Sequence, residues 1–255
     1  MKKMSFILIA FMLLLPLIEA QNTTIHHYRK VAPDNMKEFL HRAETYWKVF
    51  AEKEIEKGNL LFFAVLVKVG GNEDIQHSPN VLIITSVKDI DNEIKWMEVK
   101  DLFPDVPMED IQVHSLSTRV SSIYLRDLDN HIQGSSVNPD TDFKYAKFNY
   151  FNSTDTWKHL TFEAEVWKPM LKKAMDDGKA TMKGWGHSLI LAPETPTFQY
   201  GSVSYDLFSS IKDAYGDLFT DDVEMPEGIW DDYIANNPKP KATYLFKIIT
   251  VVSAN

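Results

Sequence analysis

The chain contains one sequence unit written twice, and this duplication constrains the fold more than any other feature. One block, Trp47-Lys48 followed by Lys53 and Gly58, recurs 120 positions later as Trp167-Lys168, Lys173 and Gly178. Two further blocks recur 116 positions later: Ser86-Val87 as Ser202-Val203, and Asp101-Leu102-Phe103 as Asp217-Leu218-Phe219. Because only two copies are present, the sequence predicts two equivalent halves that close on each other rather than a long solenoid.

Residues 1–20 have the layout of a secretory signal peptide. Lys2 and Lys3 precede an apolar run over residues 6–15, and the small residue Ala20 stands before Gln21. The run is too short to cross a bilayer comfortably, which takes roughly 20 residues. We therefore expect export to the periplasm or the extracellular space, with no membrane span once the segment is removed. A retained anchor or a buried helix is the alternative.

The composition excludes one broad class of partner. Without residues 1–20 the chain has 25 basic and 35 acidic residues, a formal charge of −10. An acidic surface repels phosphate backbones, so the sequence predicts no binding to nucleic acid. The chain has no cysteine, so an exported form has to be stabilised by its core and not by disulfides. We expect a monomer or a homodimer.

Both copies show the same order of predicted elements, strand–helix–strand–strand–helix–strand. The first copy has strands at 25–32, 60–69, 81–87 and 112–125, and helices at 34–57 and within 89–103. The second has strands at 143–151, 181–192, 199–205 and 242–252, and helices at 153–177 and 206–219. Gly58 and Gly178 end the long helices, and Pro169 should kink the second one or mark a boundary in it.

This element order is the ferredoxin-like βαββαβ arrangement, an α+β fold with both helices on one face of an antiparallel sheet. The other sheet face must be covered. We therefore predict that the sheets of the two repeats pack face to face as an α/β barrel within one chain. The repeats should span residues 21–128 and 142–255, with a turn-rich linker at 129–141. Residues 227–241 have no counterpart in the first copy and should form an ordered insert.

The residues of the second copy resemble a known group of proteins. Glu165-Val166-Trp167-Lys168-Pro169, then Gly178 and Gly184-Trp185, are similar to exported bacterial proteins of unassigned function. Those proteins are related to the dimeric α/β-barrel superfamily, with its EthD-like, NIPSNAP-like and antibiotic-biosynthesis-monooxygenase-like members. The resemblance is best over 143–219 and weaker over 25–126. It implies the fold, but not one chemistry, because the superfamily includes monooxygenases, isomerases and haem proteins.

Several polar and aromatic side chains on the predicted strands are candidate ligand contacts. Trp185 and His187 lie two residues apart and so share a face of one strand. If this face lines the barrel, with Gly184 and Gly186 letting a helix approach the other face, the tryptophan offers a stacking wall and the histidine a proton donor or acceptor. The opposite assignment, with Trp185 packed under Trp167, stays open. Further candidates on other strands are Arg29, His27 and Tyr124.

No motif for a metal, a nucleotide or another cofactor is present. His26 and His27 point to opposite faces of a strand and cannot chelate together, so we expect no metal site and no cofactor. The leading hypothesis is therefore an exported protein that binds a small, partly apolar molecule between its two sheets. The alternative is a cofactor-independent monooxygenase- or isomerase-type enzyme with a histidine base. Haem binding is a third possibility, which nothing in the residues selects.

Overall fold

The computed structural model describes residues 22–70, 79–91, 94–128, 132–193, 198–220, 223, 228–238 and 242–254. The predicted signal peptide and most of the loop expected at 70–80 lie outside the described residues. So do residues 129–131 of the linker and parts of the 227–241 insert.

The first repeat has the predicted order of elements. Strand β1 (Thr23–Val31) leads into a long helix made of α2 (Pro33–Arg42), the π-helical turn η1 (Ala43–Trp47) and α3 (Lys48–Glu56). Strands β2 (Phe62–Lys68) and β3 (Val81–Val87) follow. The expected second helix is a series of short turns before strand β4 (Ser117–Asp127): η2 (Trp96–Glu98), α4 (Val99–Leu102), α5 (Met108–Ile111) and η3 (His114–Leu116).

The second repeat follows the same plan after two short elements of the linker region, β5 (Ile132–Gln133) and α6 (Pro139–Asp142). Strand β6 (Tyr145–Phe151) leads into α7 (Thr156–Phe162), the π-helical turn η4 (Glu163–Trp167) and α8 (Lys168–Asp176). The remaining elements are β7 (Gly184–Ala192), β8 (Ser202–Phe208), α9 (Ile211–Tyr215), α10 (Ile229–Asn236) and β9 (Ala242–Ser253). Helix α10 lies in the predicted insert.

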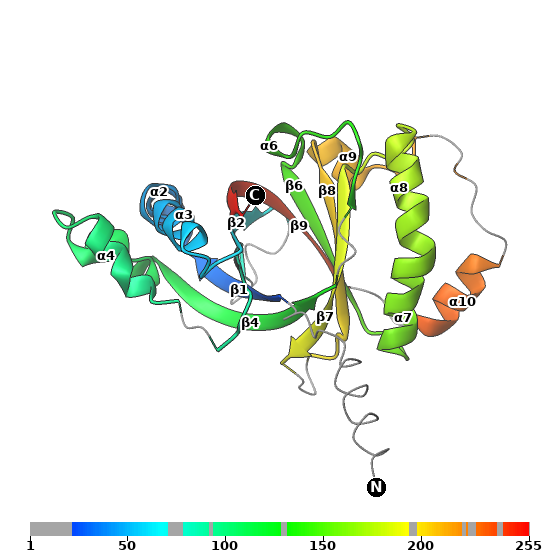
Figure 1. Cartoon of the computed structure of the whole chain (residues 1–255), viewed down its shortest axis with the longest axis horizontal. Coiled ribbons are helices and arrows are strands. Elements are labelled where there is room, and N and C mark those ends of the chain that lie inside the picture. Colours follow the sequence, from blue (N-terminus) through cyan, green and yellow to red (C-terminus); the bar gives the residue numbers. More distant parts are fainter. Residues whose placement is uncertain are drawn as a thin grey trace, which may run out of the picture.

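Eight antiparallel strands form a closed barrel, as the sequence predicts. Each repeat orders its strands as a ferredoxin-like sheet, β4-β1-β3-β2 and β9-β6-β8-β7. The pairings β2–β9 and β4–β7 join the sheets at both edges. Figure 1 shows the helices of the first repeat on one outer side of the barrel and α7, α8 and α10 on the other. Because both sheets come from one chain, the barrel closes without a partner subunit.

The long helices carry the clearest structural trace of the duplication. The π-helical turns begin at Ala43 and Glu163 and end at Trp47 and Trp167, 120 positions apart in both cases. Pro169 follows the second turn, but the first repeat has the same turn with Val49 in its place, so the proline does not cause it. Gly58 and Gly178 end the helices with φ of 78° and 71°, a conformation that glycine adopts without strain.

The 116-residue recurrence of Ser86-Val87 as Ser202-Val203 does not mark equivalent positions. Ser86-Val87 are the last two residues of β3, whereas Ser202-Val203 are the first two residues of β8. The match of these short motifs therefore does not align the two strands. The helix expected at 206–219 is also shorter than predicted, because β8 continues to Phe208 and only Ile211–Tyr215 are helical.

Three large clusters of apolar side chains divide between the inside and the outside of the barrel. The interior cluster includes Tyr28, Leu82, Leu125 and Phe148. A second cluster packs the helices of the first repeat on their sheet, and a third does the same in the second repeat. The barrel wall is therefore packed on both faces, with inward and outward residues alternating along the strands. In β9 the alternation shifts at a bulge, so that Phe246 and Ile248 belong to the interior cluster and Val252 to an outer one.

Trp47 and Trp167 occupy equivalent positions, but both are partly and not largely buried. Trp47 stacks on Trp96, with ring centroids 5.3 Å apart, and its Nε1 donates a hydrogen bond of 2.9 Å to the Ile111 carbonyl. Trp167 meets Trp230 edge to face at 5.7 Å. The first tryptophan fastens the helix to the turns that precede β4, whereas the second contacts the insert.

We expect Trp47→Ala to lower the free energy of unfolding by about 3 kcal/mol, the lower end of the range for truncating a packed aromatic residue. Trp157→Ala is the control, because this tryptophan is 60% exposed and its loss should change stability by less than about 0.5 kcal/mol. Urea titration measures both. Equal effects of the two substitutions would contradict the packing role of Trp47.

Candidate functional site

The expectation that Trp185 and His187 line the barrel interior is wrong. Trp185 belongs to the cluster that packs β7 against α8. His187 lies on the same face of β7, and the centroids of the Trp185 and His187 rings are 5.0 Å apart. The glycines do not make room for a helix. A Cβ on Gly184 would lie 3.1 Å from Phe143 and 3.2 Å from Leu207, and Leu207 belongs to the interior cluster. The space beside Gly184 is therefore filled from inside the barrel.

The other three candidates also lie outside the barrel interior. His27 and Arg29 alternate with Tyr28, which points inward, and they bond to β4. His27 Nδ1 lies 3.0 Å from Ser122 Oγ, and Arg29 Nε donates a hydrogen bond of 2.7 Å to Ser117 Oγ. Tyr124 alternates with two inward residues of β4, Ile123 and Leu125. The structure thus does not bring the five candidates together, and their contact with a ligand remains a prediction.

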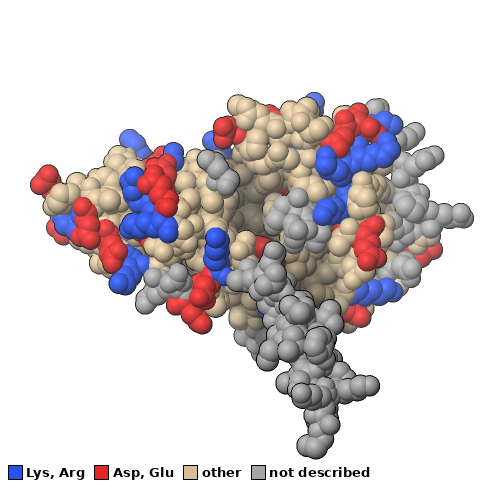
Figure 2. Space-filling view, in the orientation of Figure 1, with Lys and Arg blue, Asp and Glu red and all other residues tan. Residues whose placement is uncertain are grey.

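The barrel does contain a cavity, of about 730 Å³. Its wall is mainly apolar, with Leu66, Ile84, Phe148, Val203 and Ile248 among the lining residues. Figure 2 shows this face of the molecule hollowed between its two halves, with acidic and basic side chains interspersed around it. A space of this size and lining is typical of a site for a small apolar ligand.

Two hydrogen-bonded groups contribute polar side chains to this cavity. At one, Thr24 bonds to Ser86 and Asp127, and Ser188 Oγ donates 3.0 Å to Asp127. At the other, His26 Nδ1 lies 3.2 Å from the Tyr150 hydroxyl, which also bonds to Tyr28. Burial, and secondarily the neighbouring His27, lowers the pKa of His26 to about 3. His26 is therefore neutral at physiological pH.

The outer faces of the two sheets have different chemistry at equivalent positions. In the first repeat Val81 pairs with Arg29 on one side and Val67 on the other. In the second, Ser204 pairs with Asn149 and His187. The two rows are equivalent, because Asn149 and His187 stand 120 positions after Arg29 and Val67. In the next row, Ile83 and Val65 match Asp206 and Trp185. Polar residues thus replace three aliphatic ones: Ser204 for Val81, His187 for Val67 and Asp206 for Ile83.

The helix above shows the same replacement. His159 and Glu163 stand 120 positions after Phe39 and Ala43, which are both part of the first repeat's apolar core. His159 and Glu163 are only 2% and 4% exposed. The same framework therefore encloses an apolar core in one repeat and buried polar groups in the other. Burial of polar groups has a free-energy cost, and the first repeat shows that these two helix positions can hold apolar residues instead.

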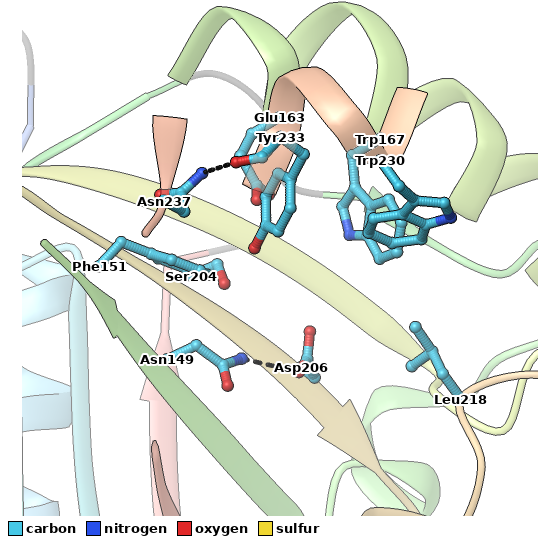
Figure 3. A pocket seen from close by; sticks show the side chains of 10 residues that line it. All are labelled: Asn149, Phe151, Glu163, Trp167, Ser204, Asp206, Leu218, Trp230, Tyr233 and Asn237. Carbon is cyan, nitrogen blue, oxygen red and sulfur yellow. Dashed lines mark hydrogen bonds between the residues drawn. The ribbon is translucent and has the colours of Figure 1, made fainter. Parts of the chain in front are cut away.

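A pocket of about 400 Å³ lies among these polar groups, between the outer face of the second sheet and its helices (Figure 3). The sheet contributes a polar floor and the helices a wall that combines aromatic rings with one carboxylate. Its lining residues are Asn149, Phe151, Glu163, Trp167, Ser204, Asp206, Leu218, Trp230, Tyr233 and Asn237.

Hydrogen bonds hold the polar floor in place. Thr243 Oγ1 donates 3.1 Å to Asn149 Oδ1, and Asn149 Nδ2 donates 3.0 Å to Asp206 Oδ2 (Figure 3). On the helix side, His159 Nε2 lies 3.6 Å from Glu163 Oε1, and His159 Nδ1 lies 3.4 Å from Asn237 Nδ2. Each carboxylate that lines the pocket is thus positioned by a neighbouring side chain.

Helix α10 completes the pocket with side chains that the first repeat lacks. It places Trp230 against Trp167, and Trp230 meets Tyr233 edge to face at 5.6 Å. Figure 3 shows the Tyr233 hydroxyl directed from the helix toward the floor. Burial, with smaller contributions from Glu163 and Asp206, raises the pKa of Tyr233. The phenol therefore stays protonated at neutral pH and can donate a hydrogen bond.

Sequence reasoning missed His159, Glu163 and Asp206. Each was part of an amphipathic or alternating pattern, in which a polar residue is expected to face water. The signal that could have found them is the comparison of the copies at the 120-residue offset, where Phe39 and Ala43 stand against His159 and Glu163. A polar residue that stands where the other repeat has a core residue indicates a candidate functional position.

The described parts of the chain contain no group of three or more His, Asp or Glu side chains arranged to hold a metal ion. None of their helices is long and apolar enough to cross a membrane.

Comparison with known proteins identifies the fold. No family model and no curated sequence matches the chain. Among solved structures, an anthrone oxidase-like protein aligns at a TM-score of 0.53 and 11% identity, over 93% of this chain and 95% of the other. A candidate monooxygenase from Lactobacillus acidophilus aligns at 0.54 and 11%, over 93% and 98%. A mutant chlorite dismutase from Candidatus Nitrospira defluvii aligns at 0.50 and 9%, over 92% and 93%.

These neighbours have dimeric α/β-barrel, ferredoxin-like folds. The chain shares this architecture, with both halves of the barrel in one polypeptide. At such low identity the likeness concerns the fold alone.

The buried polar pair can be tested by giving the second repeat the residues of the first. We expect His159→Phe alone to lower the free energy of unfolding by about 3 kcal/mol, because it leaves the Glu163 carboxylate beside an apolar ring. His159→Phe with Glu163→Ala should restore stability to within about 1 kcal/mol of the natural chain. Urea titration measures both. A double variant no more stable than His159→Phe would show that the pair is needed for the fold.

Proposed function

We propose that the pocket of the second repeat binds a small, partly aromatic organic molecule and that the protein transfers a proton on it. The observation that supports this is the asymmetry of the repeats: His159, Glu163 and Asp206 are buried where equivalent positions hold Phe39, Ala43 and Ile83. Titratable groups buried beside a cavity are typical of catalytic sites. The reaction class is that of a cofactor-independent monooxygenase- or isomerase-type enzyme.

The geometry suggests a role for each group in this proposal. Glu163 lines the pocket and is the base that accepts a proton from the substrate. His159 lies behind it, 3.6 Å away, and is a positioning residue. Tyr233, protonated at neutral pH, donates a hydrogen bond to the oxygen on which negative charge develops. The sequence-based hypothesis of a histidine base is thus replaced by a carboxylate with a histidine behind it.

The structural neighbours are compatible with this reaction class, but their likeness to the chain concerns the fold and gives neither a reaction nor a substrate. One neighbour is an anthrone oxidase-like protein and another a candidate monooxygenase. Both names describe oxidation of organic molecules, which fits a pocket walled by Phe151, Trp167, Trp230 and Tyr233.

A second candidate function is binding without chemistry. The barrel cavity of about 730 Å³, with its apolar wall and its polar group around Asp127, fits a small, partly apolar molecule held between the two sheets. This is the site that the sequence analysis favours. It is separate from the pocket of about 400 Å³ between the second sheet and its helices, which we call the helix-side pocket.

A turnover assay on a panel of small aromatic carbon acids, with and without an amino group, distinguishes the two functions. We expect Glu163→Gln to lower kcat/KM at least 100-fold, because the amide cannot accept the proton. Glu165→Gln, an exposed neighbour on the same helix, is the matched control and should keep full activity. So should Ala64→Leu, which narrows the barrel cavity.

One outcome of this assay would contradict the proposal. Turnover that survives Glu163→Gln but is lost in a folded Ala64→Leu variant would move the site into the barrel and refute the helix-side proposal.

We also propose that this function is exerted after export, in the periplasm or outside the cell. The basic start, short apolar run and Ala20–Gln21 junction support it. Mass spectrometry of the protein from a secreting host should give a chain that begins at Gln21. A chain that keeps residues 1–20 would refute the cleavage.

A further inference from the structure

We propose that the molecule bound in the helix-side pocket carries a cationic amino group on an aromatic or apolar body. This inference rests on the proposed function above and specifies its substrate class. It follows from three properties of the lining: the sign of its charges, the arrangement of its rings and its size.

The charged side chains that line the pocket are both acidic. Glu163 and Asp206 enter it from opposite sides, one from the helix and one from the sheet (Figure 3), and the residues of the lining that the structure describes include no lysine or arginine. Lys147 is the cross-strand neighbour of Asp206, but its Nζ lies 4.9 Å from the centroid of the Phe208 ring and it does not line the pocket. An anionic ligand would meet two carboxylates in a partly desolvated space, whereas an ammonium group would be attracted by both.

The aromatic wall favours the same charge. Trp167 and Trp230 meet at 70° with centroids 5.7 Å apart, and Trp230 and Tyr233 meet at 85° with centroids 5.6 Å apart. Rings at these angles expose both faces and edges to one space, as in sites that bind organic cations. Tryptophan is the strongest cation–π partner among the side chains. The site thus offers carboxylates for an ammonium group and rings for the carbon atoms attached to it.

The volume limits the ligand to a small molecule. A space of about 400 Å³ is at the lower end of ligand pockets. Asn149 fixes one carboxylate by donating to Asp206, so the anion is held in place before the ligand arrives. A monoamine with one ring fits these dimensions, and a peptide or a polymer does not.

Isothermal titration calorimetry with three matched probes tests the charge preference. The probes are 2-phenylethylamine, 2-phenylethanol and phenylacetate, which share a ring and differ in the charge of the head group. At pH 7 and low salt we expect the amine to bind at least 10-fold more tightly than the alcohol, and phenylacetate to show no binding.

Variants locate the site. Asp206→Asn should weaken amine binding at least 10-fold and alcohol binding less than 2-fold. Trp230→Ala should weaken the binding of the amine, while Trp230→Phe should retain most of it. Asp231→Asn, an exposed residue of α10, is the control and should leave every affinity unchanged.

Two results would overturn the inference, and they separate it from the proposed function. Equal or tighter binding of the alcohol, still weakened by Trp230→Ala, would leave the pocket as the binding site and refute its preference for cations. Amine binding unaffected by both Asp206→Asn and Trp230→Ala would place the ligand elsewhere. Only turnover unaffected by Glu163→Gln would also refute the proposed function.

Discussion

The pairing of β4 with β7, together with that of β2 with β9, is the constraint on which the rest of the structure depends. These two pairings turn a pair of ferredoxin-like sheets into one closed barrel, so that no long strand is left with an unpaired edge. Closure also divides the strand residues between the inside and the helix layers, since the pairing of neighbouring strands fixes which way each side chain points. One error of phase therefore moves a whole set of side chains to the wrong face.

The duplication provides an internal comparison within one molecule. Both repeats use the same strand order and the same π-helical turn before a tryptophan. In the first repeat, Phe39 and Ala43 face Val81 and Ile83 across an apolar core. In the second, His159 and Glu163 face Ser204 and Asp206, and helix α10 covers the space between them. The framework is common to both repeats, and the polar groups are the addition that distinguishes the second.

The sequence predicted much of the framework. The duplication, the strands, the glycine stops at Gly58 and Gly178, and the barrel follow from local patterns that short-range physics controls. The face of each strand could not be predicted in the same way. The strand pattern predicts that Gly184 and Gly186 admit a helix, whereas the space beside Gly184 is filled by Phe143 and Leu207 from inside the barrel. Which partner fills the space next to a glycine depends on tertiary packing, and a strand pattern does not contain that information.

The site was harder to predict than the fold for a related reason. Polar residues on amphipathic elements normally face water, so His159 and Glu163 gave no sign of burial when each helix was considered alone. Their meaning depends on what covers them, and the cover is partly α10, an insert without a counterpart in the first repeat. Only the comparison of the two copies reveals that a core position has changed its chemistry.

The most direct test of this account is crystallography of the mature chain soaked with a library of small fragments of mixed charge. The account predicts fragment density in the second repeat's pocket, between Asp206 and Trp230. It predicts none at the equivalent place around Phe39 and Ala43. Fragments confined to the barrel interior, or distributed equally over the two helix layers, would contradict the claim that the asymmetry of the repeats marks the functional site.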